Sequence, residues 1–220
     1  MRCVIFDLDG TLVDSSKDLI AAANVCFVQK GVGPMLDPIA DAGTAVRGGK
    51  AMLRLGLSRL GPVEEAEVDR WYQPLLDAYA ADVSSNTEFF DGALKAVANL
   101  KVAGYAVGIC TNKPERLARR LLTELGAIDH FASLIGADTM PTRKPDPAPF
   151  WAAVDGAGGC RDASLIVGDT ATDHKTALAC GVPSILVTFG PDGDVTQDLS
   201  PQGKIGHFDD LMGEVARLIG

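Results

Sequence analysis

The chain has 220 residues, 47% of them hydrophobic, which is enough to bury a full core as one large domain or as a core with an insert. Its formal net charge of −9 argues against nucleic acid and anionic membrane surfaces as partners. No apolar stretch reaches the roughly 18 residues of a membrane span, and the five cysteines include no Cys-x-x-Cys pair. We therefore expect a cytoplasmic globular protein that binds neither nucleic acid nor membrane.

The first predicted element is a buried central strand, Cys3-Val4-Ile5-Phe6, which is a short apolar run bounded by a turn. It leads into Asp7 and Asp9 and then into a Gly10-Thr11 turn. Two carboxylates about 4 Å apart repel each other by roughly 4 kcal/mol at an effective dielectric constant near 20. Such a pair therefore suggests a bound cation, a shared proton or a reaction.

Helical patterns follow from residue 15 to residue 85. Ser15 and Asp18 form a capping-box pattern before apolar residues at helical spacing, and Gly31 stands where that helix should end. Two more helices are predicted over residues 50–60 and 63–81, and Pro74 should kink or divide the last one. No strand pattern interrupts these helices, so residues 15–85 are predicted to form a helical insert.

Strands and helices alternate in the rest of the chain. Strands are predicted over residues 105–110, 131–135, 164–167 and 185–188, and helices over 93–103, 115–125, 148–157, 173–180 and 208–219. This alternation predicts an α/β fold with a doubly wound parallel sheet, formed by residues 1–14 and 86–220. In such sheets, ligands bind beyond the carboxyl ends of the strands.

Chemically active side chains follow these strands. They are Asp7, Asp9, Thr111, Lys144, Asp169 and Asp173. Carboxylates gathered at one sheet edge favour an oxygen-liganded cation, most simply Mg²⁺. A hydroxyl and a lysine ammonium are suited to phosphoryl oxygens. The set therefore predicts phosphoryl transfer.

Four motifs resemble, in order, those of the haloacid dehalogenase (HAD) superfamily. They are Asp7-Leu8-Asp9-Gly10-Thr11, Thr111, Lys144 with its Pro-Asp-Pro, and Gly168-Asp169-x-x-x-Asp173. The resemblance implies a Rossmann-like core, and the helical insert resembles the superfamily's small α-helical cap. Within the superfamily, Thr111-Asn-Lys-Pro and Arg143-Lys-Pro-Asp-Pro-Ala-Pro most resemble the phosphoglycolate phosphatase subgroup.

The resemblance implies a role for each matching residue. Asp7 would attack phosphorus and form an aspartyl-phosphate, and Asp9 would act as general acid and then as general base. The Asp7 carboxylate, the Asp9 backbone carbonyl and Asp169 would hold Mg²⁺, with Asp173 orienting the site. The phosphate-binding residues would be Thr111, Asn112 and Lys144. The implied enzyme is a Mg²⁺-dependent phosphatase for a small phosphorylated metabolite, and 2-phosphoglycolate is the first candidate.

Substrate specificity is expected to lie mainly in the insert. The loop of residues 43–50 is rich in glycine and carries Arg47 and Lys50, either of which could pair with a substrate carboxylate. The alternative interpretation is a flexible connector with solvated charges. Lys113, next to Asn112, is a third candidate for substrate contact.

Several alternatives remain open from the sequence. A sugar-phosphate mutase of the β-phosphoglucomutase type also keeps both acids of the first motif, and other phosphatase substrates include sugar phosphates, nucleotides and pyrophosphate. A phospho-receiver module uses a similar residue set, but receivers are shorter and have no helical cap. A calcium-binding loop would need Gly at its sixth position and Glu at its twelfth, where this chain has Leu12 and Asp18. The protein could be a monomer or a homodimer.

Overall fold

The computed structural model describes residues 1–191 and 199–220, and the chain divides into two compact units. A core unit consists of Met1–Val13 and Phe89–Gly220, and a helical unit of Asp14–Glu88 overlaps the expected insert. The chain passes between the units in two short strands, β2 (Val13–Asp14) and β3 (Glu88–Phe89). These strands pair with each other in a two-stranded sheet.

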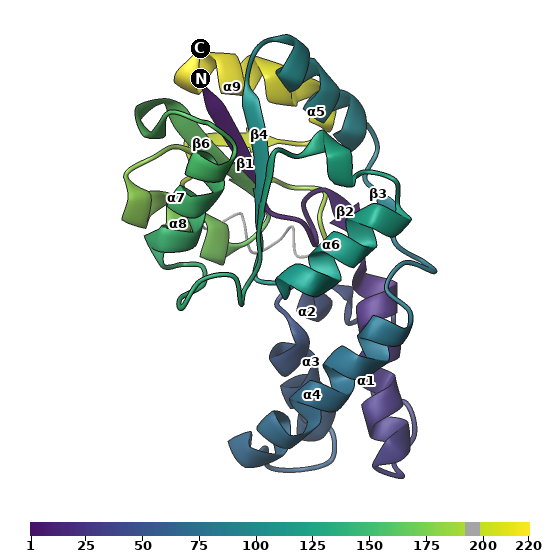
Figure 1. Cartoon of the computed structure of the whole chain (residues 1–220). Helices are drawn as coiled ribbons and strands as arrows, with labels where there is room; N and C mark the ends of the chain where they lie inside the picture. The colour runs from purple at the N-terminus through teal and green to yellow at the C-terminus, as the bar shows by residue number, and fades with distance from the viewer. Residues whose placement is uncertain (192–198) are drawn as a thin grey trace. The chain divides into compact units, whose positions relative to one another are not determined.

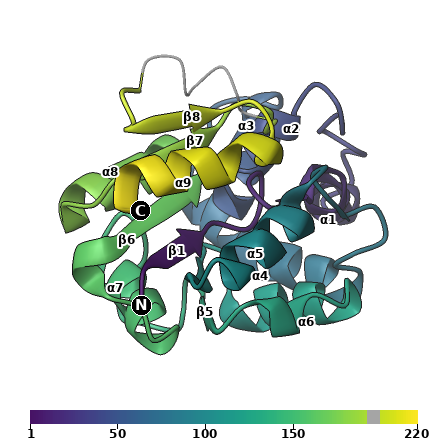
Figure 2. The same cartoon turned by 90° about the horizontal axis from the view of Figure 1, so that it is seen from above.

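The core unit is built on a six-stranded sheet in the order β5-β4-β1-β6-β7-β8 (Figures 1 and 2). Every neighbouring pair in this sheet is parallel. Its strands are β1 (Cys3–Phe6), β4 (Ala106–Cys110), β5 (Ser133–Ile135), β6 (Ser164–Gly168), β7 (Ser184–Val187) and β8 (Gly203–Ile205). All four residues of β1 are buried, as its uninterrupted apolar sequence predicts for a strand covered on both faces.

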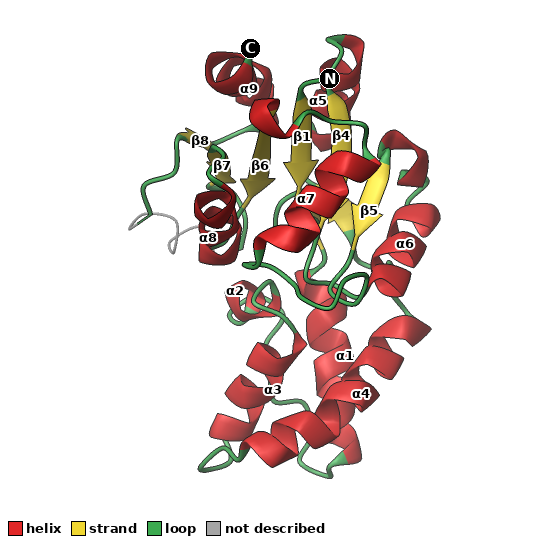
Figure 3. Cartoon of the chain, turned by 60° about the vertical axis from the view of Figure 1, so that its left-hand side comes forward, coloured by secondary structure: helices red, strands yellow, loops and turns green. Residues whose placement is uncertain are grey.

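Helices cover both faces of this sheet. The α-helices are α5 (Ala93–Val102), α6 (Glu115–Glu124), α7 (Pro147–Gly156), α8 (Ala171–Cys180) and α9 (Leu211–Ile219). Single 3-10 turns span Ile128–His130, Arg161–Ala163 and Phe208–Asp210. Helices α7 and α8 pack together on one face, α5 and α9 on the other, and α6 lies beside β5 (Figure 3). The predicted doubly wound α/β fold is confirmed.

Two details of the core differ from the sequence prediction. Strand β8 was not predicted, because three residues with an exposed Lys204 at their centre are too few to show a strand pattern. The last helix begins at Leu211 rather than at residue 208, since a 3-10 turn comes first. Neither difference affects the strand ends where the active residues lie.

The helical unit contains four α-helices: α1 (Ser16–Gln29), α2 (Ala42–Ala45), α3 (Gly49–Ser58) and α4 (Glu65–Ala81). Helices α1 and α3 both pack against α4, which buries Val68, Leu75 and Tyr79. Pro74 does not divide α4, because packing on both sides of the proline holds the helix together. The one-turn helix α2 was not predicted.

The expected capping box at Ser15 is wrong. Ser15 makes no side-chain cap hydrogen bond. Asp18 instead accepts hydrogen bonds from the Asn86 backbone N–H (3.0 Å), the Asn86 side-chain amide (2.8 Å) and the Thr87 hydroxyl (2.7 Å). This buried carboxylate therefore links the first turn of α1 to Asn86 and Thr87, at the point where the chain leaves the helical unit.

Candidate active site

The residues that follow three neighbouring strands of the core sheet lie together at its edge formed by the carboxyl ends of the strands. Strand β1 lies between β4 and β6, and Phe6 is in register with Ile109 on one side and Val167 on the other. The residues that continue these strands, Asp7, Thr111 and Asp169, consequently emerge side by side. The parallel topology thus places the first, second and fourth motifs at one sheet edge.

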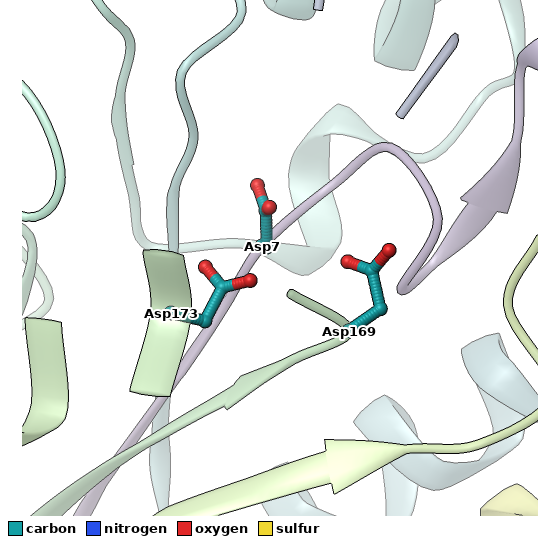
Figure 4. A group of neighbouring side chains, drawn as sticks. All are labelled: Asp7, Asp169 and Asp173. Carbon is teal, nitrogen blue, oxygen red and sulfur yellow. The ribbon is translucent and has the colours of Figure 1, made fainter. Parts of the chain in front are cut away.

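An acidic cluster forms at this edge from Asp7, Asp169 and Asp173 (Figure 4). One carboxylate oxygen from each residue lies within 4.8 Å of those from the other two. Asp169 and Asp173 are buried, and 13% of the Asp7 side chain is exposed. Three carboxylates this close repel one another unless positive charge lies among them.

Asp7 is held by two hydrogen-bond donors. Its Oδ1 accepts from the Leu8 backbone N–H at 2.7 Å, and its Oδ2 lies 3.1 Å from the Lys144 ammonium. Burial raises the pKa of Asp7 from 3.8 to about 6, and it outweighs the opposing effect of Lys144; the nearby Asp173 charge adds to the increase. The Asp7 side chain is therefore oriented and partly exposed, and its carboxyl group ionises with a pKa of about 6.

Lys144 supplies positive charge to the cluster. Its ammonium lies 2.6 Å from Asp173 Oδ1 and 3.1 Å from Asp7 Oδ2, and only 1% of its side chain is exposed. Burial opposes the charged form, but the Asp173 and Asp7 charges outweigh burial and raise the pKa of the Lys144 ammonium above its ordinary value. Lys144 therefore stays protonated between the two carboxylates.

Asp173, in the first turn of α8, uses both of its carboxylate oxygens. Oδ1 accepts from Lys144, and Oδ2 accepts from the Thr170 backbone N–H at 3.1 Å and the Thr170 hydroxyl at 2.6 Å. Asp173 is thereby tied to the start of its own helix. Its position suits it to orienting Lys144.

Asp169 is the member of the cluster with an unused oxygen. Oδ1 accepts a hydrogen bond from the Thr11 hydroxyl at 2.8 Å. Oδ2 has no hydrogen-bond partner, and it is the only such buried side-chain nitrogen or oxygen in residues 1–191 and 199–220. Burial, followed by the Asp173 and Asp7 charges, raises the pKa of Asp169 well above its usual value. A buried carboxylate oxygen without a donor, beside two other carboxylates, fits a divalent cation with oxygen ligands.

Asp9 forms an ion pair with Lys113 that the sequence analysis did not predict. The Lys113 ammonium lies 2.8 Å from Asp9 Oδ1 and 3.0 Å from Oδ2, and 4% of the Lys113 side chain is exposed. Lys113 belongs to the core unit, in the turn after β4. Lys113 comes two residues after Thr111, which directly follows β4, the strand next to β1. This spacing is the sequence feature that could have indicated the contact.

Thr111 and Asn112 occupy the same turn after β4. The buried Thr111 hydroxyl oxygen accepts from the Lys113 backbone N–H at 3.2 Å. The Asn112 side-chain amide donates to the Lys144 backbone carbonyl at 3.1 Å. Asn112 therefore joins the β4 turn to the loop that carries Lys144.

The two cationic candidates of the 43–50 loop lie in the helical unit. The Lys50 ammonium is 2.6 Å from Asp69 Oδ1 and 5.3 Å from the centre of the Tyr72 ring, so α4 already provides partners for its charge. The Arg47 side chain is exposed. The core edge thus brings together eight predicted residues: Asp7, Asp9, Thr111, Asn112, Lys113, Lys144, Asp169 and Asp173.

Comparison with known proteins places this site in a family. Residues 4–187 match the model of the haloacid dehalogenase-like hydrolases. A phosphoglycolate phosphatase of Mesorhizobium japonicum is 36% identical over 98% of this chain and 96% of its own, and one of Cereibacter sphaeroides is 34% identical over the full length of both. A solved Lactobacillus delbrueckii subsp. bulgaricus structure, described as a candidate phosphoglycolate phosphatase, superimposes with a TM-score of 0.85 at 25% identity over 99% of both chains.

In the part of the chain that the structure describes, no helix has the length and apolar character needed to span a membrane. The family match covers most of the chain, and the full-length relatives at about 35% identity are phosphatases. The chain therefore belongs to the haloacid dehalogenase-like hydrolase family, and it is an enzyme of the phosphatase type.

Proposed function

We propose that the protein is a Mg²⁺-dependent phosphomonoester hydrolase that acts through an aspartyl-phosphate on Asp7. The observation that carries this proposal is the arrangement of Asp7, Asp169 and Lys144. A partly exposed carboxylate lies beside a protonated lysine and beside a buried carboxylate oxygen that has no donor. Asp7 has the role of nucleophile because it directly follows the central strand and is the most accessible acid of the cluster.

In the first half-reaction, an Asp7 oxygen forms a bond to phosphorus while the bond between phosphorus and the leaving alcohol breaks. Asp9, two residues further on, gives its proton to the departing alkoxide. In the second half-reaction, Asp9 takes a proton from the water that attacks the aspartyl-phosphate, which releases inorganic phosphate and restores the Asp7 carboxylate. Such proton transfers typically contribute about 10²–10⁴-fold in rate.

Negative charge on the transferring phosphoryl group requires nearby positive charge and hydrogen-bond donors. Lys144 provides the charge within 3.1 Å of the nucleophile, and Thr111 and Asn112 are the proposed donors from the turn after β4. Asp7, Asp169 and the backbone carbonyl of Asp9 would hold Mg²⁺, which supplies charge neutralisation and a template for the phosphate oxygens. Asp173 would keep Lys144 in place.

We propose 2-phosphoglycolate as the substrate, because the full-length relatives at 34–36% identity are phosphoglycolate phosphatases. This substrate carries a carboxylate that needs a cation of its own. Arg47 is the residue of the helical unit proposed for that contact, since its side chain is exposed. A guanidinium matches a carboxylate with two parallel hydrogen bonds.

The test is a phosphate-release screen with Mg²⁺ and with EDTA over phosphoglycolate, sugar phosphates, nucleotides and pyrophosphate. We expect multiple turnovers with Mg²⁺, the highest kcat/KM for phosphoglycolate, and no activity for Asp7→Asn. Asp138→Asn is the matched control, because Asp138 lies in the loop after β5 and accepts the Glu115 backbone N–H there. Release of one phosphate per chain would indicate a phospho-receiver, and isomerisation of a hexose phosphate would indicate a mutase; either result refutes the proposal.

A further inference from the structure

Thr11 is a buried residue of the core edge to which the proposed reaction gives no role. Its side chain is 0% exposed, and its hydroxyl donates to Asp169 Oδ1 at 2.8 Å. The two residues are 158 positions apart in the chain. This hydrogen bond therefore joins the turn after β1 to the end of β6.

The turn that carries Thr11 is held tightly by its own backbone. The Leu8 carbonyl accepts from the N–H groups of Thr11 (3.3 Å), Leu12 (2.9 Å) and Val13 (3.1 Å). Gly10 adopts a φ of 82°, which L-residues with side chains rarely do, and its N–H donates to the Val13 carbonyl at 2.9 Å. The backbone that carries the Thr11 side chain is thus held in place by hydrogen bonds within the turn.

Asp169 is confined from a second side by the segment after β7. A Cβ atom added to Gly190 would come within 2.6 Å of the Gly10 carbonyl oxygen and 3.5 Å of the Asp169 Cβ. Only a glycine therefore lets this backbone lie so close to Gly10 and Asp169. The carboxylate is restricted on both sides, and its Oδ2 is the oxygen left without a donor.

We infer that Thr11 is a positioning residue for the divalent cation. By donating to Oδ1, it fixes the rotation of the Asp169 carboxylate and leaves Oδ2 as the oxygen offered to the metal. A ligating carboxylate commonly needs such a partner, and loss of the partner typically weakens metal affinity about 10–100-fold. This inference rests on the metal-dependent function proposed above, and it adds a residue that touches neither the metal nor the substrate.

The test measures Mg²⁺ binding by isothermal titration calorimetry, and Mn²⁺ binding by electron paramagnetic resonance, on full-length protein without substrate. Thr11→Val keeps the side-chain shape but removes the donor, so we expect a dissociation constant about 10–100-fold higher. Thr11→Ser keeps the donor and should bind both ions within about threefold of the wild type.

Thr87→Val is the matched control. Thr87 is also a buried threonine whose hydroxyl donates to a buried aspartate, Asp18, at 2.7 Å, but it lies in the helical unit. This variant loses the same kind of hydrogen bond, and its affinity for both ions should equal that of the wild type. Circular dichroism at the titration temperature establishes that every variant is folded.

The inference is overturned if folded Thr11→Val binds both ions as tightly as the wild type, if Thr11→Ser fails to restore binding, or if the wild type binds neither ion. Its failure is distinguishable from failure of the proposed function, because binding is measured without turnover. Thr11-dependent metal binding in a protein that releases no phosphate would support the inference and refute the phosphatase proposal.

Discussion

The Lys113 ammonium lies within 3.0 Å of both carboxylate oxygens of Asp9, and this ion pair joins the turn after β4 to the turn after β1. Lys113 is almost fully buried, whereas 14% of the Asp9 side chain is exposed. The proposed general acid thus has one face held by the protein and another open to solvent. Lys113 is accordingly a residue of the core unit that contacts Asp9.

Lys113→Met should misplace the Asp9 carboxylate without removing it. We expect hydrolysis of alkyl phosphates to slow by about 10²-fold or more, because their leaving alkoxides need the proton that Asp9 transfers. Hydrolysis of p-nitrophenyl phosphate should slow far less, since its leaving group departs without protonation. The measurement is kcat/KM for both substrates, because this ratio reports on transfer to Asp7 and not on the later hydrolysis step, which is the same for both. Lys95→Met is the control because Lys95 forms an exposed pair with Asp209. Equal losses for the two substrates would contradict this role.

Lys144→Met should strongly destabilise the metal-free protein. Removal of the ammonium leaves the buried carboxylate of Asp173 and the partly exposed one of Asp7 without their cation, and breaking a buried pair such as Lys144–Asp173 typically costs about 3–5 kcal/mol. Urea unfolding with EDTA measures the change, and saturating Mg²⁺ should recover part of it. Lys95→Met again serves as the control and should alter the free energy of unfolding by less than about 1 kcal/mol. A Lys144→Met protein as stable as the control would disprove this account of the cluster.

The stability of the metal-free protein should depend on the ionisation of Asp7. Its pKa rises from 3.8 to about 6 on folding, mainly through burial, so the folded state binds the proton more tightly than the unfolded state. The contribution of Asp7 is therefore fully present below about pH 4 and is lost as the pH rises through about 6, by about 1.4 kcal/mol for each pH unit crossed. The difference in unfolding free energy between wild type and Asp7→Asn, measured with EDTA from pH 3.5 to 7.5, isolates this effect. The opposite slope, or none, would contradict it.

Gly190→Ala should disturb the metal site through the backbone. The added Cβ would meet the Gly10 carbonyl oxygen at 2.6 Å, so either the turn after β1 or the segment after β7 must move. We expect weaker Mg²⁺ binding and a lower thermal midpoint, both measured on the purified variant. Gly213→Ala is the control, because a Cβ at that position in α9 would meet nothing within 4 Å. Unchanged metal affinity in Gly190→Ala would show that the site tolerates this movement.

Arg47→Ala should discriminate between substrates. If Arg47 binds the substrate carboxylate, KM for phosphoglycolate should rise at least tenfold, while KM for p-nitrophenyl phosphate should change little, since that substrate has no carboxylate. Lys50→Ala is the comparison, because its ammonium pairs with Asp69 and its loss should affect both substrates alike. Equal KM increases for the two substrates in Arg47→Ala would rule out the contact.

The sequence alone determined the class of fold and the residues of the core edge. A uniformly apolar strand before Asp7, and alternating strands and helices after residue 92, are local patterns, and parallel strands place their carboxyl ends at one edge. Asp7, Thr111 and Asp169 could therefore be predicted as neighbours before any distance was known. The helical insert was predictable in the same way, from continuous helical patterns without strands.

Tertiary structure decided which side chains contact each other. The pairs Lys113–Asp9 and Thr11–Asp169 join residues 104 and 158 positions apart, and Asp18 binds Asn86 and Thr87 rather than capping α1. Strand β8 and the continuity of α4 through Pro74 also depend on neighbours in space. The physical reason is that a polar side chain can satisfy its hydrogen bonds locally or at a distance at similar free energy, so burial and packing select the partner.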